Sequence, residues 1–195
     1  MNDHVARPGA LFMTGISNGA LLSEYLARQA SLPIVGIAPV AGTGTESSRH
    51  AAPTPRQPAR VVAFAGTDDP LVPYGGGPIG PLGRIAQRRS ARGSSPGRGL
   101  AAAAETVTAD WAVANRCSPE PVVERLAGAP GDLPVTKLTW QAPGRPAVEL
   151  YRVEGGGHTW PGGAPYLPER IVGPIAKHLD ATGIILQAFA AAITG

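Results

Sequence analysis

The chain has 195 residues, of which 43% are hydrophobic, and it carries a net charge of +3 and one cysteine, Cys117. Its length and apolar content suffice for one domain with a core, and a single cysteine excludes an intramolecular disulfide and a cysteine-based metal site. No run of 18 apolar residues occurs, which predicts no membrane span, and the arginines of residues 84–98 have no aromatic residues between them, which argues against nucleic-acid binding.

Short apolar runs occur at intervals along the chain and predict β-strands. Residues 10–14, 33–39 and 60–65 are almost wholly apolar and rich in small or β-branched residues, as expected of buried strands. Residues 135–140 and 147–153 alternate apolar and polar side chains across a Pro-Gly turn, which predicts a pair of strands joined by a hairpin.

Three other segments have helical patterns. In residues 18–30, Glu24 can pair with Arg28 one turn later, and one face carries Leu21, Leu22, Tyr25 and Leu26. Residues 100–115 are rich in alanine. A last helix is expected after Asp180, which is a good N-cap residue, with an inward face of Ile184, Ile185, Phe189 and Ile193.

The alternation of strands and helices predicts an α/β fold with a mostly parallel sheet that has helices on both faces. Residues 75–99 contain many Gly, Arg and Ser residues without periodicity, and we expect a mobile loop or a lid there. No internal repeat is present, so the whole chain, residues 1–195, is expected to belong to one domain.

A G-x-S-x-G sequence runs from Gly15 to Gly19, between the first predicted strand and the first predicted helix. A sharp strand-to-helix turn there would hold Ser17 in a strained conformation with its hydroxyl clear of the sheet, as in a nucleophile. The N–H group of Asn18 would then be a donor to an oxyanion. The same five residues also fit an ordinary glycine-rich turn with a helix-capping serine.

A nucleophilic serine needs a base, and His158 is the strongest candidate of the four histidines. It follows a predicted strand and three glycines, whose freedom of backbone conformation would let the imidazole reach across the strand ends. Asp68 and Asp69 follow the third predicted strand and could orient this base. We favour Asp69 because Pro70 would make the turn rigid, and Asp68 stays an alternative. The order serine, aspartate, histidine is that of α/β-hydrolases.

The motifs around these residues resemble the secreted serine esterases of the polyhydroxybutyrate depolymerase and feruloyl esterase type. The most specific stretch is residues 151–163, which contains Gly-Gly-Gly-His-Thr-Trp-Pro-Gly-Gly, and other matching stretches are residues 15–20, 37–43 and 66–74. The resemblance implies that Ser17, Asp69 and His158 form a catalytic triad that hydrolyses carboxylic esters through an acyl-enzyme.

It further implies that the protein is secreted and needs no metal or other cofactor. The expected substrates are short hydroxyalkanoate polyesters, or feruloyl and acetyl esters of plant polysaccharide. Tyr74 and Trp160 are expected to line the substrate pocket.

Two departures from the family pattern lead to further expectations. The second cysteine that relatives carry near residues 135–148 is missing, so Cys117 is expected to be a free thiol. Strands that precede the nucleophile in the family are also missing, which predicts a C-terminal half of an α/β-hydrolase. The strand at residues 10–14 would then be an exposed edge that promotes self-association. An alternative is a catalytically inactive fragment or binding remnant of such an esterase.

Overall fold

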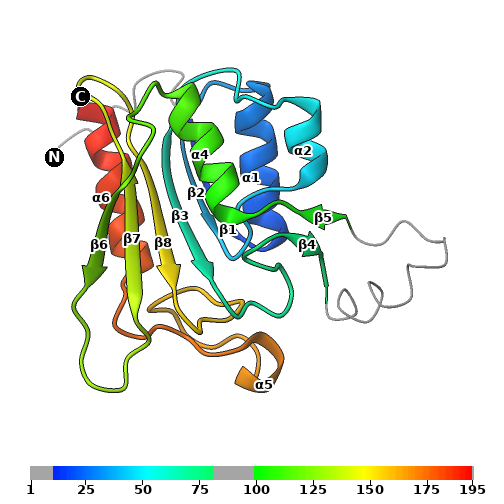
Figure 1. The fold of residues 1–195 in the computed structure, drawn as a ribbon, viewed down its shortest axis with the longest axis vertical. Coiled ribbons are helices and arrows are strands. Elements are labelled where there is room, and N and C mark those ends of the chain that lie inside the picture. Colours follow the sequence, from blue (N-terminus) through cyan, green and yellow to red (C-terminus); the bar gives the residue numbers. More distant parts are fainter. Residues whose placement is uncertain (1–10, 81–98, 195) are drawn as a thin grey trace, which may run out of the picture.

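The structure, a computed structural model, describes residues 11–80 and 99–194 and contains a twisted six-stranded sheet (Figure 1). The strand order is β1-β2-β3-β8-β7-β6. Strands β1, β2, β3 and β8 run parallel to one another, whereas β7 is antiparallel to both β8 and β6. The bounds are β1 (Leu11–Ile16), β2 (Ile34–Val40), β3 (Arg60–Gly66), β6 (Val122–Leu126), β7 (Val135–Trp140) and β8 (Val148–Val153).

Helices cover both faces of this sheet (Figure 1). Helices α1 (Asn18–Gln29) and α4 (Ala104–Ala114) pack on one face, with α2 (Glu46–Ala51) beside them, and α6 (Ala181–Thr194) packs on the other. The short helix α5 (Glu169–Val172) lies beyond the carboxyl ends of β3 and β8. The predicted α/β class is therefore confirmed, and the arrangement is consistent with an α/β-hydrolase-like fold.

The core explains why β3 is apolar at every position after Arg60. Along β3, Val61 and Ala63 face the cluster under α1 and α4, whereas Val62 and Phe64 face the cluster under α6. All four side chains are at most 1% exposed. A strand that is buried on both faces needs apolar residues at successive positions, which is the pattern of residues 60–65.

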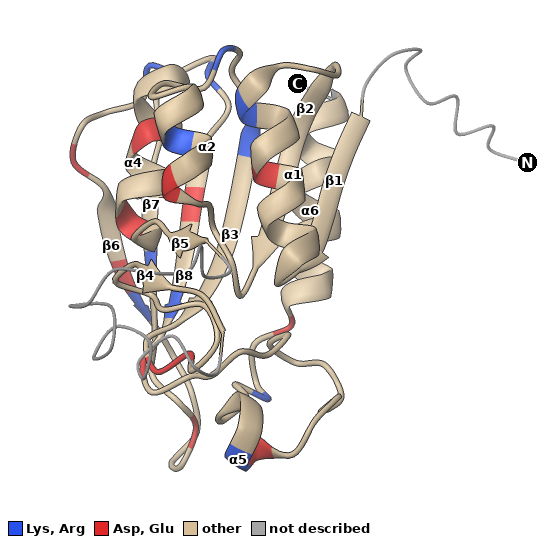
Figure 2. Ribbon diagram, turned by 90° about the vertical axis from the view of Figure 1, so that its right-hand side faces the viewer, with Lys and Arg blue, Asp and Glu red and all other residues tan. Residues whose placement is uncertain are grey.

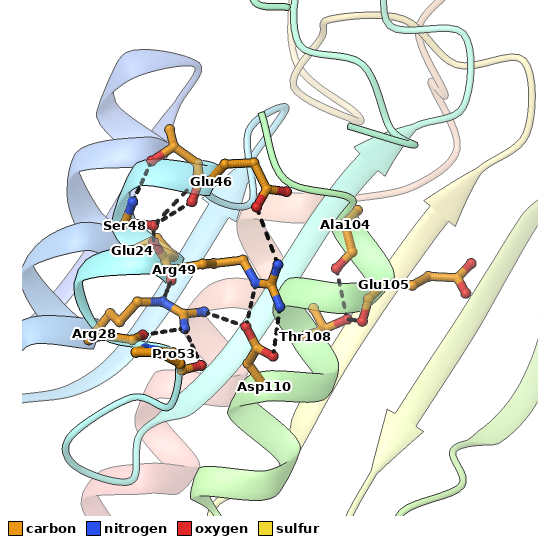
Figure 3. A network of polar contacts seen from close by, with 12 residues as sticks. Glu24, Arg28, Glu46, Ser48, Arg49, Pro53, Ala104, Glu105, Thr108 and Asp110 are labelled. Carbon is orange, nitrogen blue, oxygen red and sulfur yellow. Dashed lines mark hydrogen bonds and ion pairs between the residues drawn. The ribbon is translucent and has the colours of Figure 1, made fainter. Parts of the chain in front are cut away.

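The buried face of α1 differs from its most apolar face. Small and charged residues are buried: Ala20, Ser23, Glu24, Ala27 and Arg28. Of the apolar face seen in the sequence, Leu26 is partly buried against the core, but Leu22 and Tyr25 are 53% and 46% exposed, so only part of that face packs inward. The physical reason is that Glu24 and Arg28 have polar partners on the neighbouring helices, Ser48 of α2 for Glu24 and Asp110 of α4 for Arg28, as Figure 3 shows.

Those partners form a network that joins three helices. Arg28 donates to Glu24, to the carbonyl oxygen atoms of Ala52 and Pro53, and to Asp110 of α4 at 3.2 Å. The Ser48 hydroxyl of α2 donates to Glu24 at 2.8 Å. Figure 2 shows charged residues of α1, α2 and α4 on the side where these helices meet. Glu24 and Arg28 can be buried because each of their charged atoms has a hydrogen-bond partner.

Most other predicted elements are found with small shifts. The helix predicted at 100–115 begins at Ala104, because Leu100–Ala101 is strand β5, which pairs with β4 (Gly77–Pro78). Asp180 caps α6 by accepting a hydrogen bond from the N–H group of Gly183 at 2.9 Å. Ile193 is 40% exposed, so its predicted inward position is wrong.

Three further elements, α2, α5 and β6, have no counterpart among the predicted ones. The predicted lid, residues 75–99, lies mostly outside the described residues, which resume at residue 99 after residue 80. No helix within residues 11–80 and 99–194 is long and apolar enough to cross a membrane.

Candidate active site

Ser17 occupies a strained turn between β1 and α1. Its backbone angles are φ 58° and ψ −121°, a conformation that residues with a side chain rarely adopt. The turn brings Gly15 against Gly19, where a Cβ atom added to Gly15 would lie 2.8 Å from the carbonyl carbon of Gly19. The serine N–H group donates to the Val40 carbonyl oxygen at the end of β2, at 3.0 Å. The turn therefore requires glycine at position 15, and a turn of this kind directs the serine hydroxyl away from the sheet.

Asn18 is the first residue of α1 and is exposed. Its N–H group has no acceptor within the helix, because the first four N–H groups of an α-helix lack an intrahelical partner. The positive end of the helix dipole lies at the same place. A negatively charged oxygen next to Ser17 could therefore be stabilised there.

Asp69 lies in the turn after β3 and is held by main-chain donors. Its Oδ1 atom accepts from the N–H groups of Leu71 and Val72, both at 2.8 Å. Its Oδ2 atom lies 2.7 Å from Nδ1 of His158, and both side chains are 2% exposed. With the proton on Nδ1, the imidazole has Nε2 available as a proton acceptor.

Asp68 has a different environment from its neighbour. It is exposed, and its Oδ1 atom accepts from the hydroxyl group of Thr67 at 3.3 Å. Of the two aspartates that the sequence left open, Asp69 is the one in contact with His158.

Close packing between two loops fixes the contact between Asp69 and His158. Strands β3 and β8 are neighbours, so the loops that follow them leave the sheet side by side. A Cβ atom on Gly66 would lie 2.2 Å from the Gly156 carbonyl oxygen, and the Gly155 N–H group donates to the Thr67 hydroxyl at 2.8 Å. The glycines around His158 are thus needed for close approach of the two main chains.

Ser17, Asp69 and His158 follow the carboxyl ends of β1, β3 and β8, which are parallel strands, so all three residues lie at the same end of the sheet. Strand β2 separates β1 from β3. Within the described part of the chain, the Ser17 side chain makes no hydrogen bond with His158. Asp69 and His158 are therefore in contact, whereas Ser17 lies at the same end of the sheet without a hydrogen bond to the histidine.

The two aromatic residues that the resemblance implies for the substrate pocket both have partners within the chain. The Tyr74 hydroxyl donates to Glu105 at 2.6 Å, and burial together with that carboxylate raises the pKa of Tyr74. Trp160 donates through Nε1 to the Thr182 hydroxyl at 3.0 Å and packs against the core under α6. Their role in substrate binding stays a prediction.

Tyr166 is a residue near the site that the sequence did not single out. Its hydroxyl donates to the main-chain oxygen of His158 at 2.9 Å, and its side chain is half exposed. It lies in a Pro-rich stretch without periodicity, so no pattern in the sequence distinguishes it from other loop aromatics.

No group of three or more His, Cys, Asp or Glu side chains that could hold a metal ion occurs within the described ranges. Cys117 is a free thiol there, and burial raises its pKa.

A cavity of about 320 Å³ opens beside β6 and β7, lined by Arg125, Leu126, Pro134, Val135, Thr136 and Glu154. None of the candidate catalytic residues lines it.

The fold is consistent with that of an α/β-hydrolase-like protein. No family model matches the chain. The chain is 31% identical over 176 residues to "Putative esterase NocK" of Nocardia uniformis subsp. tsuyamanensis, an alignment that covers 89% of this chain and 48% of that protein. The chain thus spans about half the length of the curated relative it matches.

Proposed function

We propose that the chain carries the catalytic residues of a carboxylic ester hydrolase, with Ser17 as nucleophile, His158 as base and Asp69 as the acid that orients the base. The observation that carries the proposal is the 2.7 Å contact between Asp69 and His158, at the same end of the sheet as the strained Ser17. The similarity to a protein named as an esterase supports the same reaction class.

The reaction follows from the chemistry of these groups. His158 Nε2 accepts the proton of the Ser17 hydroxyl while Oγ attacks the carbonyl carbon of the ester. The oxyanion that forms accepts a hydrogen bond from the N–H group of Asn18. His158 then gives its proton to the departing alcohol, which leaves an acyl group on Ser17, and water releases the acid by the same route. Asp69 stabilises the imidazolium during both acylation and deacylation.

The choice of substrate and the expectation of secretion rest on the resemblance of the motifs to esterases of the polyhydroxybutyrate depolymerase and feruloyl esterase type. Under it, the substrates are short hydroxyalkanoate polyesters, or feruloyl and acetyl esters of polysaccharide, and the protein is secreted. Tyr74 and Trp160 would then border the acyl or alcohol part of the substrate.

Labelling with a fluorophosphonate probe tests the proposal directly. The probe should attach to Ser17, and the variants Ser17→Ala and His158→Ala should not react. Hydrolysis of p-nitrophenyl acetate should be lost in the same variants and should be indifferent to EDTA, because the triad needs no metal. Labelling that survives Ser17→Ala would contradict the assignment.

A non-catalytic remnant of an esterase is the second candidate. One observation favours it: the Ser17 side chain makes no hydrogen bond with His158 among the described residues. A remnant of this kind would neither react with the probe nor hydrolyse the ester, although Asp69 and His158 would still be in contact.

A further inference from the structure

The main chain of His158 is held on both sides by the segment that follows it. The His158 N–H group donates to the Val172 carbonyl oxygen at 2.5 Å, and the His158 carbonyl oxygen accepts from the Tyr166 hydroxyl at 2.9 Å. The imidazole is held at Nδ1 by Asp69. The backbone and the ring of this residue are therefore fixed by three separate partners.

Two of these partners differ in how they are attached. Val172 belongs to α5 and packs directly against the histidine loop, since a Cβ atom on Gly157 would lie only 2.1 Å from the Val172 carbonyl oxygen. The Gly157 N–H group also donates to the Pro174 carbonyl oxygen at 2.8 Å. Figure 1 shows this segment beyond the ends of β3 and β8. Tyr166, in contrast, reaches the loop through its side chain alone, so its contribution can be removed by one substitution.

Tyr166 lies between the site and solvent. Its side chain is 51% exposed, yet its hydroxyl is directed at the carbonyl oxygen of a residue that is 1% exposed. Burial, together with the negative charge of Asp69, raises the pKa of the phenol. The phenol therefore stays protonated, and remains a donor, across the neutral pH range.

We propose that Tyr166 is a positioning residue for His158, a role that rests on the proposed function of His158 as the catalytic base. Three glycines precede His158, at 155–157, and glycine gives a main chain more freedom than any other residue. A side-chain bond to the next carbonyl group restricts that freedom at the residue where orientation matters. A displacement of about 1 Å in a catalytic group can lower the rate by about 10²-fold.

The variant Tyr166→Phe tests the proposal because it keeps the ring and removes only the hydroxyl. The kcat for p-nitrophenyl acetate should fall roughly ten-fold with little change in KM, since the bond acts on the base and not on the substrate. The proton on His158 Nδ1 should be visible by NMR far downfield in the wild type, and in the variant it should exchange faster with solvent. Tyr25→Phe is the matched control, because Tyr25 is a half-exposed tyrosine on α1, and it should change neither readout.

Two results would overturn the proposal. If kcat and the downfield proton were both unchanged in Tyr166→Phe, the bond to His158 would have no positioning effect. If KM rose while kcat and the proton stayed the same, the hydroxyl would contact the substrate instead. The NMR readout also separates this proposal from the proposed function. A wild-type protein without probe labelling would contradict catalysis, whereas the exchange rate of the proton would still report on Tyr166.

Discussion

Asp69 and His158 are 89 positions apart in the sequence, yet Oδ2 of the aspartate lies 2.7 Å from Nδ1 of the histidine, with both side chains buried. The other oxygen of Asp69 is occupied by two main-chain N–H groups. The carboxylate therefore cannot turn away from the imidazole without breaking those bonds. Asp68 lacks such anchoring, although it is the adjacent residue.

This difference predicts unequal effects for two conservative substitutions. Asp69→Asn should lower ester turnover by orders of magnitude, since the corresponding change in a serine protease triad lowers kcat by about 10⁴ through the wrong imidazole tautomer. Asp68→Asn, the matched control, should change turnover less than about three-fold, because Asp68 is exposed and, among the described residues, its side chain bonds only to the neighbouring Thr67 hydroxyl. Steady-state kinetics with a p-nitrophenyl ester measures both, and a larger loss in the Asp68 variant would contradict the prediction.

The buried pair of Glu24 and Arg28 predicts a large loss of stability when one partner is removed. Both side chains are 0% exposed, and Arg28→Met would leave Glu24 without its cation. We expect the free energy of unfolding to fall by about 3–5 kcal/mol, as for other buried charges left unpaired. Arg49→Met is the matched control, because Arg49 binds Asp110 of the same network but its side chain is 26% exposed. This change should cost less than about 1 kcal/mol. Urea titration measures both, and equal losses would show that burial of the pair is unimportant.

Glu24 also predicts a dependence of stability on pH. Burial raises the pKa of Glu24 above its ordinary value of 4.5, although Arg28 and Ser48 oppose the shift. The folded chain therefore holds this proton more tightly than the unfolded chain does. The free energy of unfolding should decrease as the pH rises from about 4.5 through the folded-state pKa. Glu24→Gln should flatten this part of a stability curve measured between pH 4 and pH 8, and an unchanged slope would assign it to another group.

Asn115 predicts a second large loss of stability, at a site without charge. Its amide donates to the carbonyl oxygen atoms of Ala59 and Pro146, both at 2.7 Å, and accepts from the Ala59 N–H group at 3.0 Å. Asn115→Ala leaves these buried groups unpaired and should cost about 3 kcal/mol. Gln57→Ala is the control, since Gln57 also donates to two carbonyl groups but is only partly buried, and it should cost less than about 1 kcal/mol by thermal or urea unfolding. Similar losses in the two variants would argue against a special role for the buried amide.

The sequence predicts elements well where one pattern of burial holds along the whole element. Strands β2 and β3 are buried on both faces along most of their length and are apolar apart from Arg60. Strands β7 and β8 were recognised from the mixture of apolar and polar residues on either side of a turn. Strand β6 was missed because Val122 and Val123 are successive residues that are both exposed, so no alternation marks it. Local pattern thus fails where a strand is paired by its main chain without a buried face.

Long-range contacts explain the remaining differences. The buried face of α1 depends on Ser48, Pro53 and Asp110, which are distant in the sequence and supply the partners of Glu24 and Arg28. The preference for Asp69 over Asp68 rested on the rigidity of Pro70, whereas in the structure the N–H groups of the following residues orient the carboxylate. Tyr166 was missed because a bond from a loop tyrosine to a main-chain oxygen has no sequence signature.

The edge of the sheet at β1 predicts self-association. Among the described strands β1 pairs with β2 alone, and Leu11–Ile16 contains no charged residue, as its tan ribbon in Figure 2 shows. Leu22 and Tyr25 of α1, the helix that packs on β1 and β2, are about half exposed. An uncharged strand edge next to apolar side chains favours pairing with another chain.

We therefore expect larger species to form as the protein concentration rises, in size-exclusion chromatography with light scattering. The double variant Leu22→Lys/Tyr25→Lys should shift the population toward monomer, because it puts charge on the helix packed on β1, and that charge would have to be desolvated in a contact between two copies. Val113→Lys is the matched control, since Val113 is a 67% exposed apolar residue on α4, a helix that packs on β3 and β8. It should leave the distribution unchanged. A wild-type chain that stays monomeric at every concentration would contradict the prediction. An equal shift in both variants would instead attribute association to general surface hydrophobicity, because only pairing at β1 makes the position of the added charge matter.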